Sequence, residues 1–199
     1  MKVFVTGATG FIGGHLVRAL VARGDQVAAV VRNPAKAQDL AALGVKLYAG
    51  DITDKESMRA AMTGVDAVFH LAAWYKIGAR DKSEAEKINV GGTRNVLELM
   101  RDLHIKKGVY TSTLAIFSDT HGQPVDESYR FEGKHLSEYD RTKAEAHYDV
   151  ALSLMAVGLP LVIVQPGVVY GPGDPSAIGD TLRLYLQGKL PLVPQQTAF

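Results

Sequence analysis

The chain has 199 residues, 47% of them hydrophobic, which is enough for one substantial core and short for two full domains. Its 22 basic and 21 acidic residues leave a net charge of +1, which disfavours nucleic acid and anionic membranes as partners and favours small molecules. The absence of cysteine excludes disulfides, thiolate metal sites and a cysteine nucleophile, and it agrees with a cytoplasmic location. The six histidines are scattered, so we expect no metal site. We also expect no membrane span and no secretory signal, since no apolar run is long enough and the chain begins directly with a strand.

The first predicted element is a short apolar strand, Lys2–Thr6, which runs into a glycine-rich segment at 7–13. Apolar residues at helical spacing follow it, namely Ile12, Leu16 and Leu20. Gly7 permits a sharp turn, Gly10 lets backbone N–H groups approach a phosphate, and Gly13 lets the helix pack closely. A strand, a glycine turn and a helix in this order predict a binding site for the pyrophosphate of a dinucleotide.

The rest of the chain alternates apolar runs with helical patterns. The runs predict strands at 26–31, 45–49, 67–71, 107–111 and 161–164. The helical patterns lie at 34–43, 54–62, 83–103 and 137–157, and Asp54 and Ser137 are expected N-caps. This rhythm predicts an α/β fold, a Rossmann doubly wound parallel sheet of about six strands with helices on both faces. We expect residues 1–175 to form this dinucleotide-binding domain and residues 176–199 to begin a second lobe.

The glycine spacing, G-x-x-G-x-x-G, resembles that of the extended branch of the short-chain dehydrogenase/reductase superfamily. This branch contains nucleotide-sugar epimerases and dehydratases and the dihydroflavonol reductases, and our chain is most similar to the last group. The resemblance runs from Val3 to about Val193. Because members of the branch continue into a larger C-terminal lobe, we expect a shortened chain. The resemblance implies that the following residues bind the cofactor: Gly7, Thr9, Gly10, Phe11, Ile12 and Gly13.

The residue that closes the second strand meets the adenosine ribose in these folds. A carboxylate there accepts a hydrogen bond from a free 2′-hydroxyl, whereas a guanidinium binds a 2′-phosphate. Here the residue is Arg32, with Lys36 close behind it, while Asp25 precedes the strand and fits the carboxylate role poorly. The sequence therefore predicts NADPH in preference to NADH, with NAD still possible. A solvated surface arginine is the alternative interpretation of Arg32.

The resemblance implies further cofactor contacts after the later strands. Asp51 and Ile52 match the positions that bind adenine, although Asp51 also suits a simple turn cap. Asn89 matches an asparagine that holds the loop beside the cofactor, and a purely structural role is equally open. The positions implied to lie along the nicotinamide and its ribose are Leu71, Ala72, Ala73, Pro166, Val168 and Val169.

Tyr139 and Lys143 form a Y-x-x-x-K pattern, and positions i and i+4 of a helix project from one face. A nearby ammonium favours a phenolate, so Lys143 is expected to lower the pKa of Tyr139 and suit it to acid–base work. The resemblance places the third catalytic residue at the end of the fifth strand, at Thr113, with Ser112 as the less favoured choice. A solvated helix face is the alternative for the pattern as a whole.

These residues predict an NAD(P)-dependent oxidoreductase that transfers hydride between NADPH and a carbonyl or alcohol substrate, similar to dihydroflavonol reductases. Trp74 and Tyr75 are candidates for an apolar substrate wall. One alternative is a nucleotide-sugar epimerase or dehydratase that holds NAD tightly. Another is a truncated remnant that binds the dinucleotide without turnover. We expect a homodimer, because long helices such as 83–103 and 137–157 pair across dimers in the related enzymes.

Overall fold

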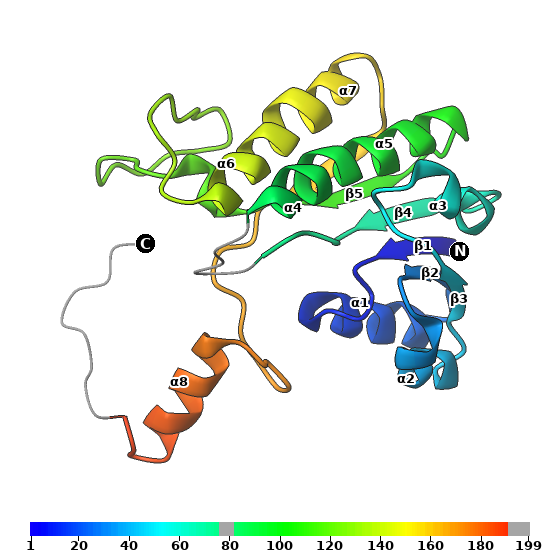
Figure 1. Ribbon diagram of the computed structural model, residues 1–199, viewed down its shortest axis with the longest axis horizontal. Coiled ribbons are helices and arrows are strands. Elements are labelled where there is room, and N and C mark those ends of the chain that lie inside the picture. The colour runs from blue at the N-terminus through cyan, green and yellow to red at the C-terminus, as the bar shows by residue number, and fades with distance from the viewer. Residues whose placement is uncertain (76–81, 191–199) are drawn as a thin grey trace. The chain divides into compact units, whose positions relative to one another are not determined.

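Six parallel strands form one sheet in the order β3-β2-β1-β4-β5-β6 (Figure 1). The computed structural model describes residues 1–75 and 82–190. The strands are β1 Lys2–Thr6, β2 Gln26–Val31, β3 Lys46–Ala49, β4 Ala67–His70, β5 Gly108–Thr111 and β6 Leu161–Val164. The predicted α/β class and the six strands are confirmed. Strand order reverses between β1 and β4, and in such sheets ligands bind outside the carboxyl ends of the strands at this point.

The described helices are α1 Phe11–Ala22, α2 Gln38–Ala42, α3 Lys55–Met62, α4 Ser83–Ala85, α5 Thr93–Asp102, α6 Glu138–Glu145, α7 Ser153–Ala156 and α8 Ala177–Leu186. Two π-helical segments, Glu86–Gly92 and Ala146–Leu152, join α4 to α5 and α6 to α7, so the long predicted helices are continuous. Asp54 and Ser137 accept hydrogen bonds from the first turns of α3 and α6, as expected for N-caps.

The single helix predicted at 34–43 is wrong in detail. The segment is split into a 3₁₀ turn, Pro34–Lys36, and the short helix α2. The Asn33 side chain accepts a hydrogen bond from the Ala35 N–H and so caps a tight turn, and Ala37 departs from helical geometry with φ −123° and ψ 31°. Local capping by asparagine therefore competes with a continuous helix.

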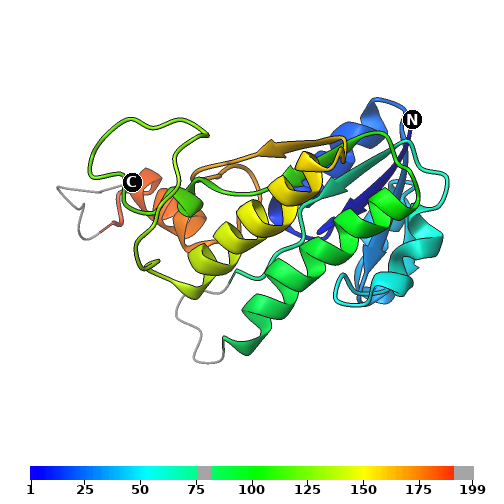
Figure 2. The same ribbon diagram turned by 90° about the horizontal axis from the view of Figure 1, so that it is seen from above.

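Helices cover the two faces of the sheet differently (Figures 1 and 2). On one face α1 and α2 pack on alternate residues of the strands, including the fully buried Val3 and Val5. On the other face α3, α5 and the helix from α6 to α7 cover Phe4 and Val68. Successive strand residues point to opposite faces, so one short apolar strand contributes to both cores.

The chain divides into two compact units, Met1–Gly167 and Val168–Phe199. In the second unit the buried Asp174 carboxylate accepts hydrogen bonds from the N–H and hydroxyl of Ser176, which caps α8. Residues 191–199 of the lobe expected from residue 176 onward lie outside the described part of the chain. Among the described residues, no helix is both long and apolar enough to cross a bilayer.

Candidate active site

The glycine turn after β1 has a geometry that only glycine fits. Gly7 has φ +73°, and a Cβ there would lie 2.7 Å from the backbone nitrogen of Ala72. A Cβ on Gly13 would lie 2.0 Å from the Gly7 carbonyl oxygen. Gly10 donates to that same oxygen at 3.0 Å and starts α1 without a side-chain cap. The first N–H groups of α1 are thus left for an anion, and this close-packed cradle at the strand reversal fits a dinucleotide pyrophosphate.

Thr6 ties this turn to the chain after β4. Its hydroxyl accepts from the N–H groups of Leu71 and Ala72 at 3.2 and 3.1 Å, and it forms a 2.7 Å hydrogen bond with Nδ1 of the buried His70. The segment predicted to run beside the nicotinamide ribose therefore lies directly against the glycine turn. The predicted cofactor residues that are exposed here are Thr9, Gly10, Ile12 and Ala73, while Phe11 is half-buried.

Positive side chains follow β2, as the cofactor prediction requires. Arg32 comes directly after the strand and Lys36 ends the next turn, both are exposed, and neither forms an ion pair within the described residues. Asp25 lies at the opposite end of β2, where its carboxylate bonds the N-terminal amine and Arg23. Asp25 is therefore unavailable to a ribose at the carboxyl end of the strand.

Asp51 and Ile52, which follow β3, both make contacts that stabilise the fold. One Asp51 carboxylate oxygen accepts from the Thr53 N–H at 2.8 Å, so the residue caps its turn as the alternative interpretation required. Ile52 is buried against Gly92, where a Cβ would lie 2.5 Å from the Ile52 Cδ1 atom. The second carboxylate oxygen of Asp51 has no hydrogen bond within the described residues, which leaves it for an adenine amino group.

Tyr139 lies close to Thr113, beyond the carboxyl end of β5. Tyr139 lies in the first turn of α6, and Thr113 follows β5, where its hydroxyl also accepts from the Ala115 N–H. Burial raises the pKa of the Tyr139 phenol, and a hydrogen bond with Thr113 partly opposes that rise. The Tyr75 ring packs edge-on against Tyr139 with centroids 4.8 Å apart. Ser112 instead bonds the buried His147 at 3.0 Å, so the geometry favours Thr113 over Ser112.

Lys143 is buried in the same region. Its ammonium donates to the Tyr110 hydroxyl at 3.0 Å and to the Thr111 carbonyl at 2.9 Å. Burial lowers the pKa of Lys143 to about 7. The expected lowering of the Tyr139 pKa by Lys143 is not found, because the charge is desolvated and its donors turn toward β5. Sequence reasoning missed Tyr110, whose only signal was a polar residue inside a buried strand.

The remaining predicted positions differ in what they do. Asn89 is buried and bonds the Trp74 backbone and the Thr142 hydroxyl, so it holds the loop after β4. Trp74 is itself buried, which leaves Tyr75 as the exposed aromatic of the pair. The Pro166 carbonyl accepts from the Leu114 N–H at 3.1 Å and so fixes the chain beyond β6. Val168 and Val169 are exposed residues of the second unit.

A model of the NAD dependent epimerase/dehydratase family matches residues 3–195. The chain belongs to this family. Its members use a nicotinamide dinucleotide, in agreement with the cradle after β1, and they include oxidoreductases and epimerases. The resemblance to the extended branch is therefore confirmed, including its dihydroflavonol-reductase-like members.

Two curated relatives and one solved structure are similar over most of the chain. A 4-hydroxy-2-methyl-3-oxo-4-farnesyl-3,4-dihydroquinoline-1-oxide ketoreductase of Stigmatella aurantiaca is 38% identical, over 87% of this chain and 52% of its own. A Synechocystis protein named "Putative dihydroflavonol 4-reductase" is 35% identical, over 94% of this chain and 55% of its own. The UDP-glucose 4-epimerase of Thermus thermophilus, in complex with NAD, is 30% identical with a TM-score of 0.77, over 94% and 63% of the two chains. The chain thus spans about half the length of the curated relatives it matches.

Proposed function

We propose that this chain carries the cofactor site and catalytic residues of an NADPH-dependent reductase that acts on a carbonyl or alcohol substrate. The feature that supports this most is the position of Tyr139 near Thr113, beyond the carboxyl end of β5, in the same parallel sheet as the strand that leads into the glycine turn. When bound, the nicotinamide supplies or accepts the hydride. Tyr139 gives or takes the proton of the substrate oxygen, and Thr113 orients that oxygen. Lys143, one helical turn after Tyr139, is buried and donates a hydrogen bond to the Thr111 carbonyl.

The preference for NADPH is supported by Arg32 and Lys36. Both are exposed beyond the carboxyl end of β2, next to β1 in the sheet, so two positive charges stand on the ribose side of the glycine turn. A guanidinium binds a 2′-phosphate with paired hydrogen bonds, while the Asp25 carboxylate, which could have bound a free 2′-hydroxyl, lies at the opposite end of β2 and bonds the N-terminal amine and Arg23.

The proposed function is tested by following NADPH absorbance with a panel of ketones and aldehydes, using the purified chain and its Tyr139→Phe variant. Oxidation of NADPH by any substrate, lost in the variant, supports the reductase. Binding of NADPH without oxidation in the whole panel supports the alternative of a dinucleotide-binding remnant. The hydride step needs a cleft that excludes water, and a chain without such a cleft would bind NADPH without oxidising it.

A nucleotide-sugar epimerase or dehydratase is the second candidate, supported by the similarity to the UDP-glucose 4-epimerase of Thermus thermophilus. Such an enzyme reduces and reoxidises one held NAD in each cycle. We therefore expect purified chain to release NAD on denaturation if this candidate is right, and to release none if the reductase is right. Nucleotide in the supernatant is measured by chromatography.

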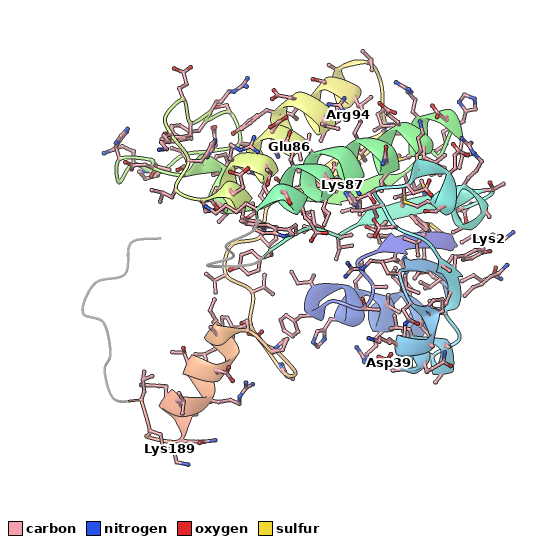
Figure 3. The ribbon with its side chains drawn as sticks, viewed as in Figure 1. Lys2, Asp39, Glu86, Lys87, Arg94 and Lys189 are labelled. Carbon is pink, nitrogen blue, oxygen red and sulfur yellow. The ribbon has the colours of Figure 1, made fainter. Side chains whose placement is uncertain are left out.

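We further propose that the chain acts in the cytoplasm as a homodimer on a small-molecule substrate. The balanced charge and the lack of cysteine support this environment and this class of ligand. The helix from α4 to α5 carries charged residues such as Glu86, Lys87 and Arg94 on its surface (Figure 3), so a dimer formed there would be polar. Light scattering at several protein concentrations tests the oligomeric state.

A further inference from the structure

Lys143 belongs to a buried polar group that the proposed reaction does not by itself explain. We refer to it as the Lys143 cluster, and its members come from β4, from β5 and the residue after it, from α5 and from the helix that begins with α6. All of them are less than 6% exposed: His70, Thr93, Tyr110, Ser112, Lys143 and His147. A buried polar group is costly unless its hydrogen bonds are satisfied, so such a cluster has to be well connected.

Tyr110 is the member that touches most of the others. Its hydroxyl accepts the hydrogen bond of Lys143 at 3.0 Å, and it also interacts with the side chains of Thr93 and Ser112. Its ring stacks on the His70 ring, with centroids 5.5 Å apart and an interplanar angle of 18°. The Tyr110 side chain is fully buried, so its hydroxyl is held at one point in the core.

The Lys143 ammonium has three donors and two fixed acceptors, the Tyr110 hydroxyl and the Thr111 carbonyl. One donor is left for a ligand. No carboxylate forms an ion pair with Lys143 among residues 1–75 and 82–190. The ammonium therefore depends on uncharged acceptors for its stabilisation.

The titratable groups around Lys143 supply no compensating charge. Burial lowers the pKa of His70 to about 3 and that of His147 to about 4, so both imidazoles are neutral at pH 7. Burial raises the pKa of Tyr110 and of Tyr139, so both phenols keep their protons. These groups thus carry no charge beside the amine, and the hydroxyl of Tyr110 accepts its hydrogen bond at 3.0 Å.

We propose that Tyr110 is the positioning residue of Lys143, holding the amine in place and in its charged form through the hydroxyl. A charged Lys143 with one free donor is the state that suits binding of a ribose hydroxyl, so the catalytic meaning of this inference rests on the proposed function. The contact itself, and its effect on the amine, do not rest on it.

The direct test is the titration of Lys143 by NMR in protein labelled with ¹³C at the lysine Cε, with the signal assigned by its loss in Lys143→Met. Tyr110→Phe removes the hydroxyl and keeps the ring. We expect Lys143 to titrate about one pH unit lower in this variant, because a hydrogen bond to a charged group is lost. Tyr148→Phe is the matched control, since it removes a half-buried hydroxyl that donates to the Tyr129 carbonyl. It should leave the titration unchanged.

A double-mutant cycle gives a second readout if the labelled variant is poorly folded. The free energies of unfolding of wild type, Tyr110→Phe, Lys143→Met and the double variant are compared at pH 6 by urea denaturation. Tyr110→Phe should be less destabilising in the Lys143→Met background, because no ammonium then needs the hydroxyl. Equal destabilisation in both backgrounds, or an unshifted Lys143 titration, would overturn the inference.

The outcomes separate this inference from the proposed function. In an active enzyme, Tyr110→Phe should lower turnover at pH 7 about fivefold, since a pKa one unit lower reduces the charged fraction of Lys143 by about that factor. A shifted titration in a chain that oxidises no NADPH with any carbonyl supports the role of Tyr110 and counts against the reductase. If the Lys143 titration is unshifted in a chain that does oxidise NADPH, the reductase is supported and the role of Tyr110 is refuted.

Discussion

The side-chain amide of Asn89 pairs with the backbone of Trp74 as a neighbouring strand would. Its Oδ1 atom accepts from the Trp74 N–H at 2.7 Å, and its Nδ2 atom donates to the Trp74 carbonyl at 3.1 Å. The same Nδ2 atom donates to the Thr142 hydroxyl at 2.9 Å. One buried amide thus links the segment after β4 to α6, the helix that carries Tyr139. It satisfies backbone groups that have left the sheet.

We predict that Asn89→Ala lowers the free energy of unfolding by about 3 kcal/mol, since it leaves buried backbone groups at Trp74 without partners. Urea denaturation measures the loss. Asn95→Ala is the matched control, because Asn95 is half-buried and gives a single hydrogen bond, to the Ile52 carbonyl at 2.9 Å. The control should lose about 1 kcal/mol. Equal losses in the two variants would show that the hydrogen bonds from Asn89 to the Trp74 backbone stabilise the fold no more than the single bond of Asn95.

The close packing of the glycine turn leads to a second prediction, which compares two glycine-to-alanine substitutions. Gly13→Ala would place a Cβ 2.0 Å from the Gly7 carbonyl oxygen, so the turn has to open and NADPH binding should be lost. Gly24→Ala is the control: Gly24 has φ +86° but open space around it, so the strain costs only about 1 kcal/mol. Calorimetric titration with NADPH and a thermal melt compare the two. NADPH binding retained in Gly13→Ala would refute the placement of the pyrophosphate.

Much of this architecture follows from the sequence, because buried parallel strands are continuous apolar runs. The strands Lys2–Thr6, Gln26–Val31 and Leu161–Val164 have the predicted bounds. The glycine turn was predictable for a similar reason, since its chemistry is local. The orientation of Lys143 was not, because it depends on contacts between β5 and α6 that lie more than thirty residues apart in sequence. An i, i+4 spacing fixes a shared face and says nothing about which acceptor a long side chain reaches.

We predict that Arg32→Ala weakens NADPH binding by about 10- to 100-fold, the effect of losing charge-assisted hydrogen bonds to a 2′-phosphate. NADH, which lacks that phosphate, should bind as before. Calorimetric titration with both nucleotides gives the ratio. Arg94→Ala, at an exposed position on α5 (Figure 3), controls for the loss of one positive charge. If NADPH and NADH weaken equally in Arg32→Ala, Arg32 does not read the 2′-phosphate.

Tyr139→Phe keeps the ring that packs against Tyr75 and removes the proton donor. We therefore expect turnover to fall at least about 100-fold, the usual contribution of a general acid, with NADPH affinity unchanged. Steady-state kinetics and calorimetric titration measure the two quantities. Tyr129→Phe, which loses a hydrogen bond to the Asp119 carbonyl in a loop, should keep its activity. A Tyr139→Phe enzyme with most of its turnover would remove Tyr139 from the chemistry.

The buried histidines predict acid lability of the fold. His70 and His147 have folded pKa values of about 3 and about 4, both lowered from 6.5 by burial. Between these values and 6.5 the unfolded chain binds more protons than the folded one, so stability is complete above pH 6.5 and falls as the pH drops. At pH 5 each imidazole accounts for a loss of about 2 kcal/mol.

This pH effect is checked by urea denaturation of wild type and His147→Gln at pH 7 and pH 5. Glutamine does not titrate, so the variant should lose about 2 kcal/mol less than wild type between the two pH values. Carboxylates contribute equally to both proteins, and the comparison therefore isolates the imidazole. If wild type and His147→Gln lose the same free energy of unfolding between pH 7 and pH 5, the pKa of His147 is not lowered in the folded state. The imidazole would then be protonated at pH 5 in the folded chain, close to the amine of Lys143.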